Sequence, residues 1–243
     1  GSKLFNSTFN ITGGIAEFDG IIQTTNTAGS TSSLVVAPSG TATLMLGGAT
    51  PLSGLSATGT NVMTFNNTGA TINYSGGAQT VYTDASITGL STGVSYRNII
   101  FSGTGVKTAN AGNLNVTGDF TNTLVCDASN YTNFSSPTVN FNGTTQNLAG
   151  GAGNGTTFYN VTFSGAGTKT MASGSFNIAS SGVLTMSGTN SSTVLAANGL
   201  LTLNSDVTGS ATVAAINGPS ITGNVNAQRY ITGGVGYRNY RLA

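Results

Sequence analysis

Short runs of alternating apolar and polar residues recur along the chain, each bounded by Gly, Asn or Ser. In the run 138–143 (TVNFNG), Val139 and Phe141 fall on one side and Asn140 and Asn142 on the other. Alternation of period two over a few residues indicates a strand with one buried side. No stretch combines helical periodicity with good helix formers. The pattern therefore predicts an all-β chain.

Further runs follow the same pattern. In residues 159–163 (YNVTF) the alternation places Tyr159, Val161 and Phe163 on the buried side. Similar short runs are 176–178 (FNI), 183–186 (VLTM) and 200–204 (LLTLN). Their length and their Gly-rich borders fit strands joined by tight turns.

Nearly the same eight residues occur twice, as FSGTGVKT at 101–108 and FSGAGTKT at 163–170, which is 62 positions apart (163 − 101). The similarity continues upstream, where 72–81 (INYSGGAQTV) matches 139–148 (VNFNGTTQNL) at an offset of 67 (139 − 72). The two copies cover residues 72–120 and 139–186, and matching downstream strands are GNLNV and GSFNI. Duplication of this kind is typical of structural repeats and rare for catalytic motifs.

Each copy holds about three strand–turn groups of about 20 residues, which is the low end of the range for solenoid repeats. One group cannot bury its apolar side, whereas groups stacked as parallel coils about 4.8 Å apart can. We therefore expect a single-stranded, right-handed parallel β-helix of about ten coils over residues 1–222. Equivalent positions would then stack as amide ladders, Asn98 on Asn160 and Asn115 on Asn177.

Tandem β-sandwiches are the alternative fold. They require antiparallel hairpins, whose two-residue turns favour Asn-Gly. Such pairs occur at 142–143, 154–155, 198–199 and 217–218.

The chain is almost free of charge. Charged residues make up 5% of the 243 residues, against about 25% in an average soluble protein. The net charge of +1 argues against nucleic-acid binding and against a polybasic membrane patch, since both need clustered positive charge. No apolar run approaches the roughly 18 residues of a membrane span. With 38% hydrophobic residues, the chain also differs from typical disordered sequences.

The residue types exclude several kinds of chemistry. The chain has no histidine and one cysteine, Cys126, so it offers neither an imidazole base nor a Cys-rich zinc site. We expect Cys126 to be a small buried residue. Lys107 and Lys169 occupy equivalent positions of the repeat, and we expect them to point outward and to discourage lateral strand pairing. No cofactor is expected.

One pair of acids could carry chemistry. Glu17 and Asp19 are two residues apart on an expected strand and would share one side of it. Such a pair could bind Ca²⁺ or cleave a glycosidic bond. The alternative, which we favour, is a solvated pair near the N-terminal end.

The C-terminal segment 223–243 is the only part enriched in cations and aromatics. We expect it to be a cap on the last coil or a junction to a following module. Its side chains could also bind a sugar or a partner protein through stacking and cation–π contacts. The candidate residues are Arg229, Tyr230, Tyr237, Arg238, Tyr240 and Arg241.

The repeat resembles those of a known group of proteins. The order of NYSGGAQTV, YRNIIFSGTGVKT and GNLNVTGDF is similar to repeats of large adhesin-like surface proteins of Bacteroidetes, which usually leave the cell by type IX secretion. The resemblance covers 72–120 and 139–186 well and residues 3–71 in composition only. It implies location at the surface of a Gram-negative bacterium and a structural or adhesive role. It supplies no catalytic residues.

These observations predict a non-enzymatic spacer or adhesion module of a secreted cell-surface protein. Its partners would be surface polysaccharide or neighbouring modules of the same protein, which a polar and nearly uncharged surface could contact by hydrogen bonds. The start Gly1-Ser2-Lys3, which lacks Met, indicates an excised fragment. The alternative is a β-helix that binds or cleaves carbohydrate. Thr-x-Thr units at 41/43, 58/60 and 168/170 are too irregularly spaced for an ice-binding lattice.

Overall fold

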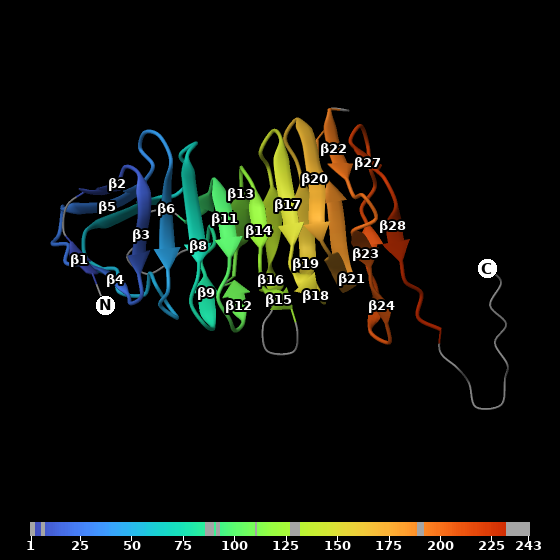
Figure 1. Ribbon diagram of the computed structural model, residues 1–243, viewed down its shortest axis with the longest axis horizontal. Helices are drawn as coiled ribbons and strands as arrows, with labels where there is room; N and C mark the ends of the chain where they lie inside the picture. Colours follow the sequence, from blue (N-terminus) through green and yellow to red (C-terminus); the bar gives the residue numbers. More distant parts are fainter. Residues whose placement is uncertain are drawn as a thin grey trace.

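The computed structural model describes residues 3–5, 8–85, 90, 93–109, 111–126, 132–188 and 192–231, with the side chains of 3–5, 126, 133, 135 and 136 left out. These residues form strands and turns and no helix. The all-β prediction is therefore confirmed. Because nearly all strand pairs are parallel and join segments about one coil apart, the chain is a parallel β-solenoid. Figure 1 shows the coils stacked along the long axis of the molecule.

Each coil has three faces. The first face is a sheet of nine strands. In spatial order they are β3 (Gly14–Phe18), β6 (Ala42–Leu46), β8 (Ala70–Tyr74), β11 (Asn98–Phe101), β14 (Phe120–Asn122), β17 (Gln146–Gly150), β20 (Gly167–Gly174), β22 (Thr193–Ala196) and β27 (Ser220–Thr222).

The second and third faces share three long strands that bend at a corner, β16 (Thr132–Phe141), β19 (Thr156–Phe163) and β21 (Phe176–Met186). The N-terminal parts of these strands continue the second face, together with β1 (Lys3–Phe5), β4 (Ile22–Thr24), β9 (Gln79–Val81), β12 (Lys107–Ala109), β23 (Leu201–Leu203) and β28 (Val225–Ala227). Their C-terminal parts continue the third face, together with β2 (Thr8–Ile11), β5 (Thr31–Val36), β7 (Thr60–Thr64), β10 (Ser95–Tyr96), β13 (Asn113–Val116) and β26 (Thr212–Val213).

The stack comprises about eight turns, fewer than the ten expected. The sheet register shows why. Lys3 pairs with Ile22 and Phe65 with Tyr96, so one coil takes between 19 (22 − 3) and 31 (96 − 65) residues. Three strands and three corners need more chain than the single group of about 20 residues that the repeat suggested. At about 4.8 Å per coil, the stack is about 40 Å long.

The two sequence copies lie on different faces. Strand β8 is on the first face, whereas its equivalent in the second copy, the end of β16, is on the third. The expected stacking of Asn98 on Asn160 is therefore wrong: Asn98 pairs with Thr71, and Asn160 pairs with Thr138. The stacking of Asn115 on Asn177 is wrong for the same reason.

A single core fills the solenoid. Phe101 and Phe163 both belong to it, so the equivalent aromatics of the two copies share one interior. Ring contacts pass from coil to coil, from Tyr74 to Phe101 (5.9 Å between centroids), to Phe120 (5.5 Å), to Phe141 (5.6 Å) and to Phe163 (5.2 Å). Tandem sandwiches with separate cores are thereby excluded for the described residues.

The repeated motif builds a tight corner. In FSGTGVKT and FSGAGTKT, the glycines Gly103, Gly105, Gly165 and Gly167 all have positive φ, between 71° and 92°, a conformation that favours Gly. A Cβ at Gly103 would also lie 2.1 Å from the main-chain oxygen of Ser75 in the preceding coil. The duplication therefore preserves a corner that only glycine can form.

Two other local expectations need correction. Tyr159 is 37% exposed, because β19 turns a corner between Phe158 and Asn160 and the buried side chain there is Phe158. The Asn-Gly pairs lie at corners or turns between successive strands rather than in hairpins. The antiparallel pair that the structure describes is the hairpin of β24 (Ser205–Asp206) and β25 (Gly209–Ser210), and β15 (Val125–Cys126) pairs in parallel with β18 (Ala152–Gly153). The side chain of Cys126 lies outside the described part.

Candidate functional site

The C-terminal cation–aromatic cluster is only partly described. Arg229 and Tyr230 follow β28 and are exposed, and the main-chain nitrogen of Tyr230 donates to Oγ of Ser205 at 3.0 Å. The other candidates, Tyr237, Arg238, Tyr240 and Arg241, lie outside the described residues. Strand β28 pairs with β23, so the boundary expected after residue 222 falls between two strands of the last coil.

Glu17 and Asp19 lie on the same side of the first coil, as expected. Both are exposed and flank the buried Phe18. The neighbouring coil contributes no acid here, because Glu17 is opposite Met45 and Asp19 lies against Gly47. Within the described ranges, no group of three or more Asp, Glu, His or Cys side chains could share a metal ion. Among the described residues, the structure therefore offers two carboxylates with no third carboxylate, imidazole or thiol group beside them.

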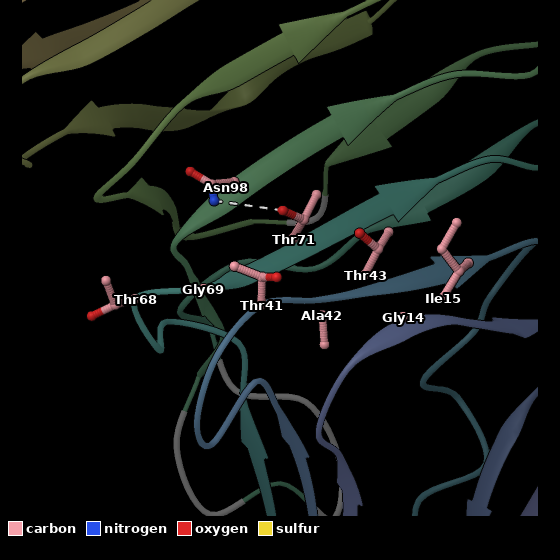
Figure 2. A pocket seen from close by; sticks show the side chains of 9 residues that line it. All are labelled: Gly14, Ile15, Thr41, Ala42, Thr43, Thr68, Gly69, Thr71 and Asn98. Carbon is pink, nitrogen blue, oxygen red and sulfur yellow. Dashed lines mark hydrogen bonds between the residues drawn. The ribbon is translucent and has the colours of Figure 1, made fainter.

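An open groove crosses the first face near its N-terminal end (Figure 2). Its volume is about 300 Å³. Its walls come from β3, β6, β8 and β11 and the corners that precede them, and none of the lining residues is charged. The lining residues are Gly14, Ile15, Thr41, Ala42, Thr43, Thr68, Gly69, Thr71 and Asn98.

The floor of the groove is a row of outward side chains in register. Thr43 pairs with Ile15 on one side and with Thr71 on the other, and Thr71 pairs with Asn98. Asn98 is held in place because its amide donates to the main-chain oxygen of Ala70 at 3.0 Å. Ile15 is 72% exposed. The groove thus offers hydroxyls and an amide beside an exposed apolar side chain, a combination suited to a neutral sugar.

The sequence analysis did not predict this groove, because the repeat offset of 62 to 67 residues is not the length of one coil. The relevant signal is ATL at 42–44 and ATI at 70–72, 28 residues apart (70 − 42). This spacing is the coil length that places Thr43 beside Thr71.

The third face carries a second uncharged outward row. It runs through Ser95, Asn115, Asn140, Thr162 and Thr185, one residue from each coil. The amide of Asn140 donates to Oδ1 of Asn115 at 2.8 Å, so an amide ladder does form, between residues of consecutive coils.

Lys107 and Lys169 point inward, and the prediction of outward lysines is wrong. Both side chains are 0% exposed. The ammonium of Lys107 donates to the main-chain oxygens of Gly76 (2.6 Å), Gly77 (2.7 Å) and Thr104 (3.2 Å) and to Oε1 of Gln79 (2.8 Å). Corners of consecutive coils turn these oxygens inward, and a buried acceptor is costly unless a donor reaches it. The lysine is that donor.

Gln79 serves the preceding corner in the same way. Its Nε2 donates to the main-chain oxygens of Leu46 (2.6 Å) and Gly48 (2.8 Å), while its Oε1 accepts from the nitrogen of Gly76 (2.9 Å). Lys107 pairs with Gln79 in the sheet register. The two side chains thus form a polar column inside the apolar core.

The second sequence copy repeats this column on another face. Gln146 donates to the main-chain oxygens of Val116 and Gly118 at 3.0 and 2.5 Å. Lys169 pairs with Gln146 in the register and donates to the main-chain oxygen of Gly165 at 2.7 Å. Gln and Lys therefore recur in the duplicated sequence because their side chains donate hydrogen bonds to buried main-chain oxygens at the corners. Ligand binding is not needed to explain them.

Three buried tyrosines form a second polar cluster. The hydroxyls of Tyr74 and Tyr96 are 2.6 Å apart, and that of Tyr96 donates to the main-chain oxygen of Tyr82 at 2.7 Å. Burial raises the pKa of Tyr74 and Tyr96 well above 10.0. Burial also lowers the pKa of Lys107 from 10.5 to about 8 and lowers that of Lys169.

Comparison with protein-family models, with curated proteins and with solved structures gives no match for this chain. The class that the geometry defines is a three-sided parallel β-solenoid with a polar, weakly charged surface. The part of the chain that the structure describes contains no helix long and apolar enough to cross a membrane.

Replacing Gln79 by Leu is expected to lower the free energy of unfolding by about 2–4 kcal/mol, because buried main-chain groups of two coils lose their partner. Denaturant unfolding followed by circular dichroism measures the change. Thr80→Val, on the same strand and directed outward, is the matched control and should change stability by less than about 0.5 kcal/mol. Equal effects of the two substitutions would contradict the role assigned to Gln79.

Stability should depend on pH with a maximum near pH 9–10. The unfolded chain keeps the ordinary lysine pKa of 10.5, so above about pH 8 it binds more protons than the folded chain and the free energy of unfolding rises with pH. Above pH 10 the tyrosines of the unfolded chain ionise while Tyr74 and Tyr96 stay neutral, so stability falls. Chemical unfolding between pH 7 and 11 tests this, and Lys107→Met should flatten the rising part. A steady decline from pH 7 would refute it.

Proposed function

We propose that this chain is a non-enzymatic structural and adhesive module of a secreted bacterial cell-surface protein, which spaces its neighbours apart and contacts neutral polysaccharide. The observation that carries the proposal is the uncharged groove on a rigid solenoid. The sequence resemblance to surface repeats of Bacteroidetes supports the location and export by type IX secretion.

The rigidity follows from the continuous core. The nine-stranded sheet of the first face joins every described coil to the next, and ring contacts from Phe101 to Phe163 add to it. No boundary between separate cores interrupts the stack among the described residues. Bending the stack would break main-chain hydrogen bonds on one face and compress another. Such a rod keeps whatever is attached to its two ends at a fixed separation.

The groove suits a neutral polysaccharide better than a charged ligand. Ile15 provides an apolar surface for the C–H side of a sugar ring, and Thr43, Thr71 and Asn98 provide donors and acceptors for its hydroxyls. The sheet holds these side chains in place before binding, so little conformational entropy is lost on contact.

Charges placed in the groove should abolish retention on neutral glycans. We expect Thr43→Glu/Thr71→Glu to reduce binding to a neutral glycan array, or to polysaccharide-coated beads, at least tenfold. A bound glycan would bury the two carboxylates, and the groove has no positively charged lining residue to pair with them. The matched control is Thr162→Glu/Thr185→Glu, which introduces the same charges on adjacent coils of the third face. Equal retention of both variants would remove the groove from the proposal, and no retention of the unmodified chain would leave the spacer role alone.

Carbohydrate cleavage is the second candidate, because the acid pair borders the groove. Glu17 is two residues from Ile15 on the same side of β3. Asp19 follows directly after β3 and is exposed like Glu17, so this edge of the first face supplies the two acids that glycosidic cleavage needs. A glycan bound across the coils would pass close to Glu17.

If the chain cleaves glycans, Glu17→Gln/Asp19→Asn should remove the activity while leaving retention on the glycan unchanged. Release of reducing ends from neutral polysaccharides measures cleavage, and the groove variant should lose both properties. We expect no release by the unmodified chain, in line with the non-enzymatic proposal. Release that the double variant abolishes would replace that proposal with the enzymatic one.

A further inference from the structure

A second groove lies at the edge of the first face, where strands β14, β17 and β20 end. Its volume is about 270 Å³, close to that of the groove at the starts of β3 to β11, which is called the first groove below. None of the lining residues, all of which the structure describes, is charged. They include Asn122, Thr123, Gly151, Ala152, Ser173 and Gly174.

The floor of the second groove consists largely of main chain. Three of its seven lining residues are glycines. The register shifts at this point, because Leu148 pairs with Met171 but the next residue, Ala149, pairs with Ser173, so that Ala172 has no partner in β17. A bulge of this kind interrupts the hydrogen-bond ladder. Hydroxyl groups of a ligand can therefore reach main-chain donors and acceptors as well as the exposed Ser173.

An uncharged path connects the two grooves diagonally across the first face. The first groove ends at Asn98, at the start of β11. The next outward side chain of β11 is Ile100, which pairs with the outward Thr121 of β14. Two residues beyond Thr121 the chain reaches Thr123, in the second groove. Figure 1 shows β11 and β14 side by side in the middle of the stack.

A carboxylate occupies the straight route from the first groove along the stack. Asp119 lies beside Asn98 in the next coil, and its main-chain nitrogen donates to Oδ1 of Asn98 at 2.9 Å. The Asp119 side chain is half-buried, and its Oδ1 accepts from the main-chain nitrogen of Asn147 at 2.8 Å. A neutral sugar on the straight route would remove water from this carboxylate, which is costly. The path over Ile100 avoids that cost.

We propose that the second groove is a further subsite for neutral glycan, so that one extended oligosaccharide occupies both grooves and crosses the first face over Ile100 and Thr121. The inference rests on the proposed function, because it extends the same glycan site. From Thr71 to Gly151 the path advances four residues along the strands and three coils along the stack, which is about 20 Å. Asp119 beside the path repels sugars that carry a carboxylate.

The dependence of affinity on glycan length tests the proposal. The probes are size-graded cello-, manno- and galacto-oligosaccharides, and titration calorimetry measures their binding. The affinity of the unmodified chain should increase at least tenfold once the oligosaccharide is longer than about 20 Å. Ala152→Glu/Ser173→Glu places two carboxylates in the second groove, at positions that are exposed. This variant should lose the increase with length and keep its affinity for short oligosaccharides.

Two further variants separate the parts of the site. Ile100→Glu interrupts the path and should also remove the increase with length, whereas Thr43→Glu/Thr71→Glu should weaken the binding of every length. The control is Thr162→Glu/Thr185→Glu on the third face, which should keep the length dependence. Circular dichroism and thermal unfolding check that each variant is folded. Ala152→Gln/Ser173→Gln, which fills the second groove without a charge, replaces the Glu variant if that variant unfolds.

The possible failures are distinguishable. Length dependence that survives in the second-groove variant, or affinity that is independent of length in the unmodified chain, overturns this inference and leaves the proposed function in place. Length dependence that is lost in the second-groove variant but kept in Ile100→Glu overturns the single diagonal path. If the unmodified chain binds none of the oligosaccharides, the inference and the adhesive part of the proposed function both fail.

Discussion

The structure depends on parallel hydrogen bonding between consecutive coils, which forces each side chain to stack on its counterparts in the coils above and below. An inward position must be apolar in every coil, or its polar groups must be satisfied within the stack. The third face meets this constraint with apolar inward residues in successive coils, such as Leu114, Val139, Val161 and Leu184, which are at most 1% exposed. The second face interrupts its inner column with Gln79 and Lys107 and satisfies both with corner oxygens.

The buried lysines show how this solenoid turns its corners. A tight corner directs main-chain oxygens into the core, and water cannot reach them there. The long side chains of Gln79 and Lys107 deliver donors to the corners of adjacent coils while their aliphatic parts remain among apolar neighbours. The ammonium is desolvated, as the lowered pKa of Lys107 indicates, but the corner oxygens are paired. A protein with so few charges places two of them where no solvent reaches.

Alternation and duplication were sufficient to predict the solenoid, since both follow from local sequence. The number of coils, the direction of Lys107 and the partners of Asn98 could not be predicted, because they depend on how much chain each coil consumes. Tyr159 was misplaced because a corner within β19 shifts the alternation by one residue. The groove joins Ile15, Thr43 and Asn98 from separate coils, and that juxtaposition exists only once the register is known. For Glu17 and Asp19 the local pattern was sufficient to predict exposure, because they flank the inward Phe18, although Asp19 lies just beyond the end of β3.

The shift of the second copy to another face has a consequence for how such chains grow. The second copy is displaced from the first by two whole coils plus two of the three faces. The displacement is the same from β8 to the end of β16 and from β11 to the end of β19. A duplicated gene segment therefore needs to encode a whole number of faces, not of coils, to extend the stack without a break. A series of such segments would point the same surface residues in three directions in turn. Any contact made by one segment would then be offered around the whole circumference of the rod.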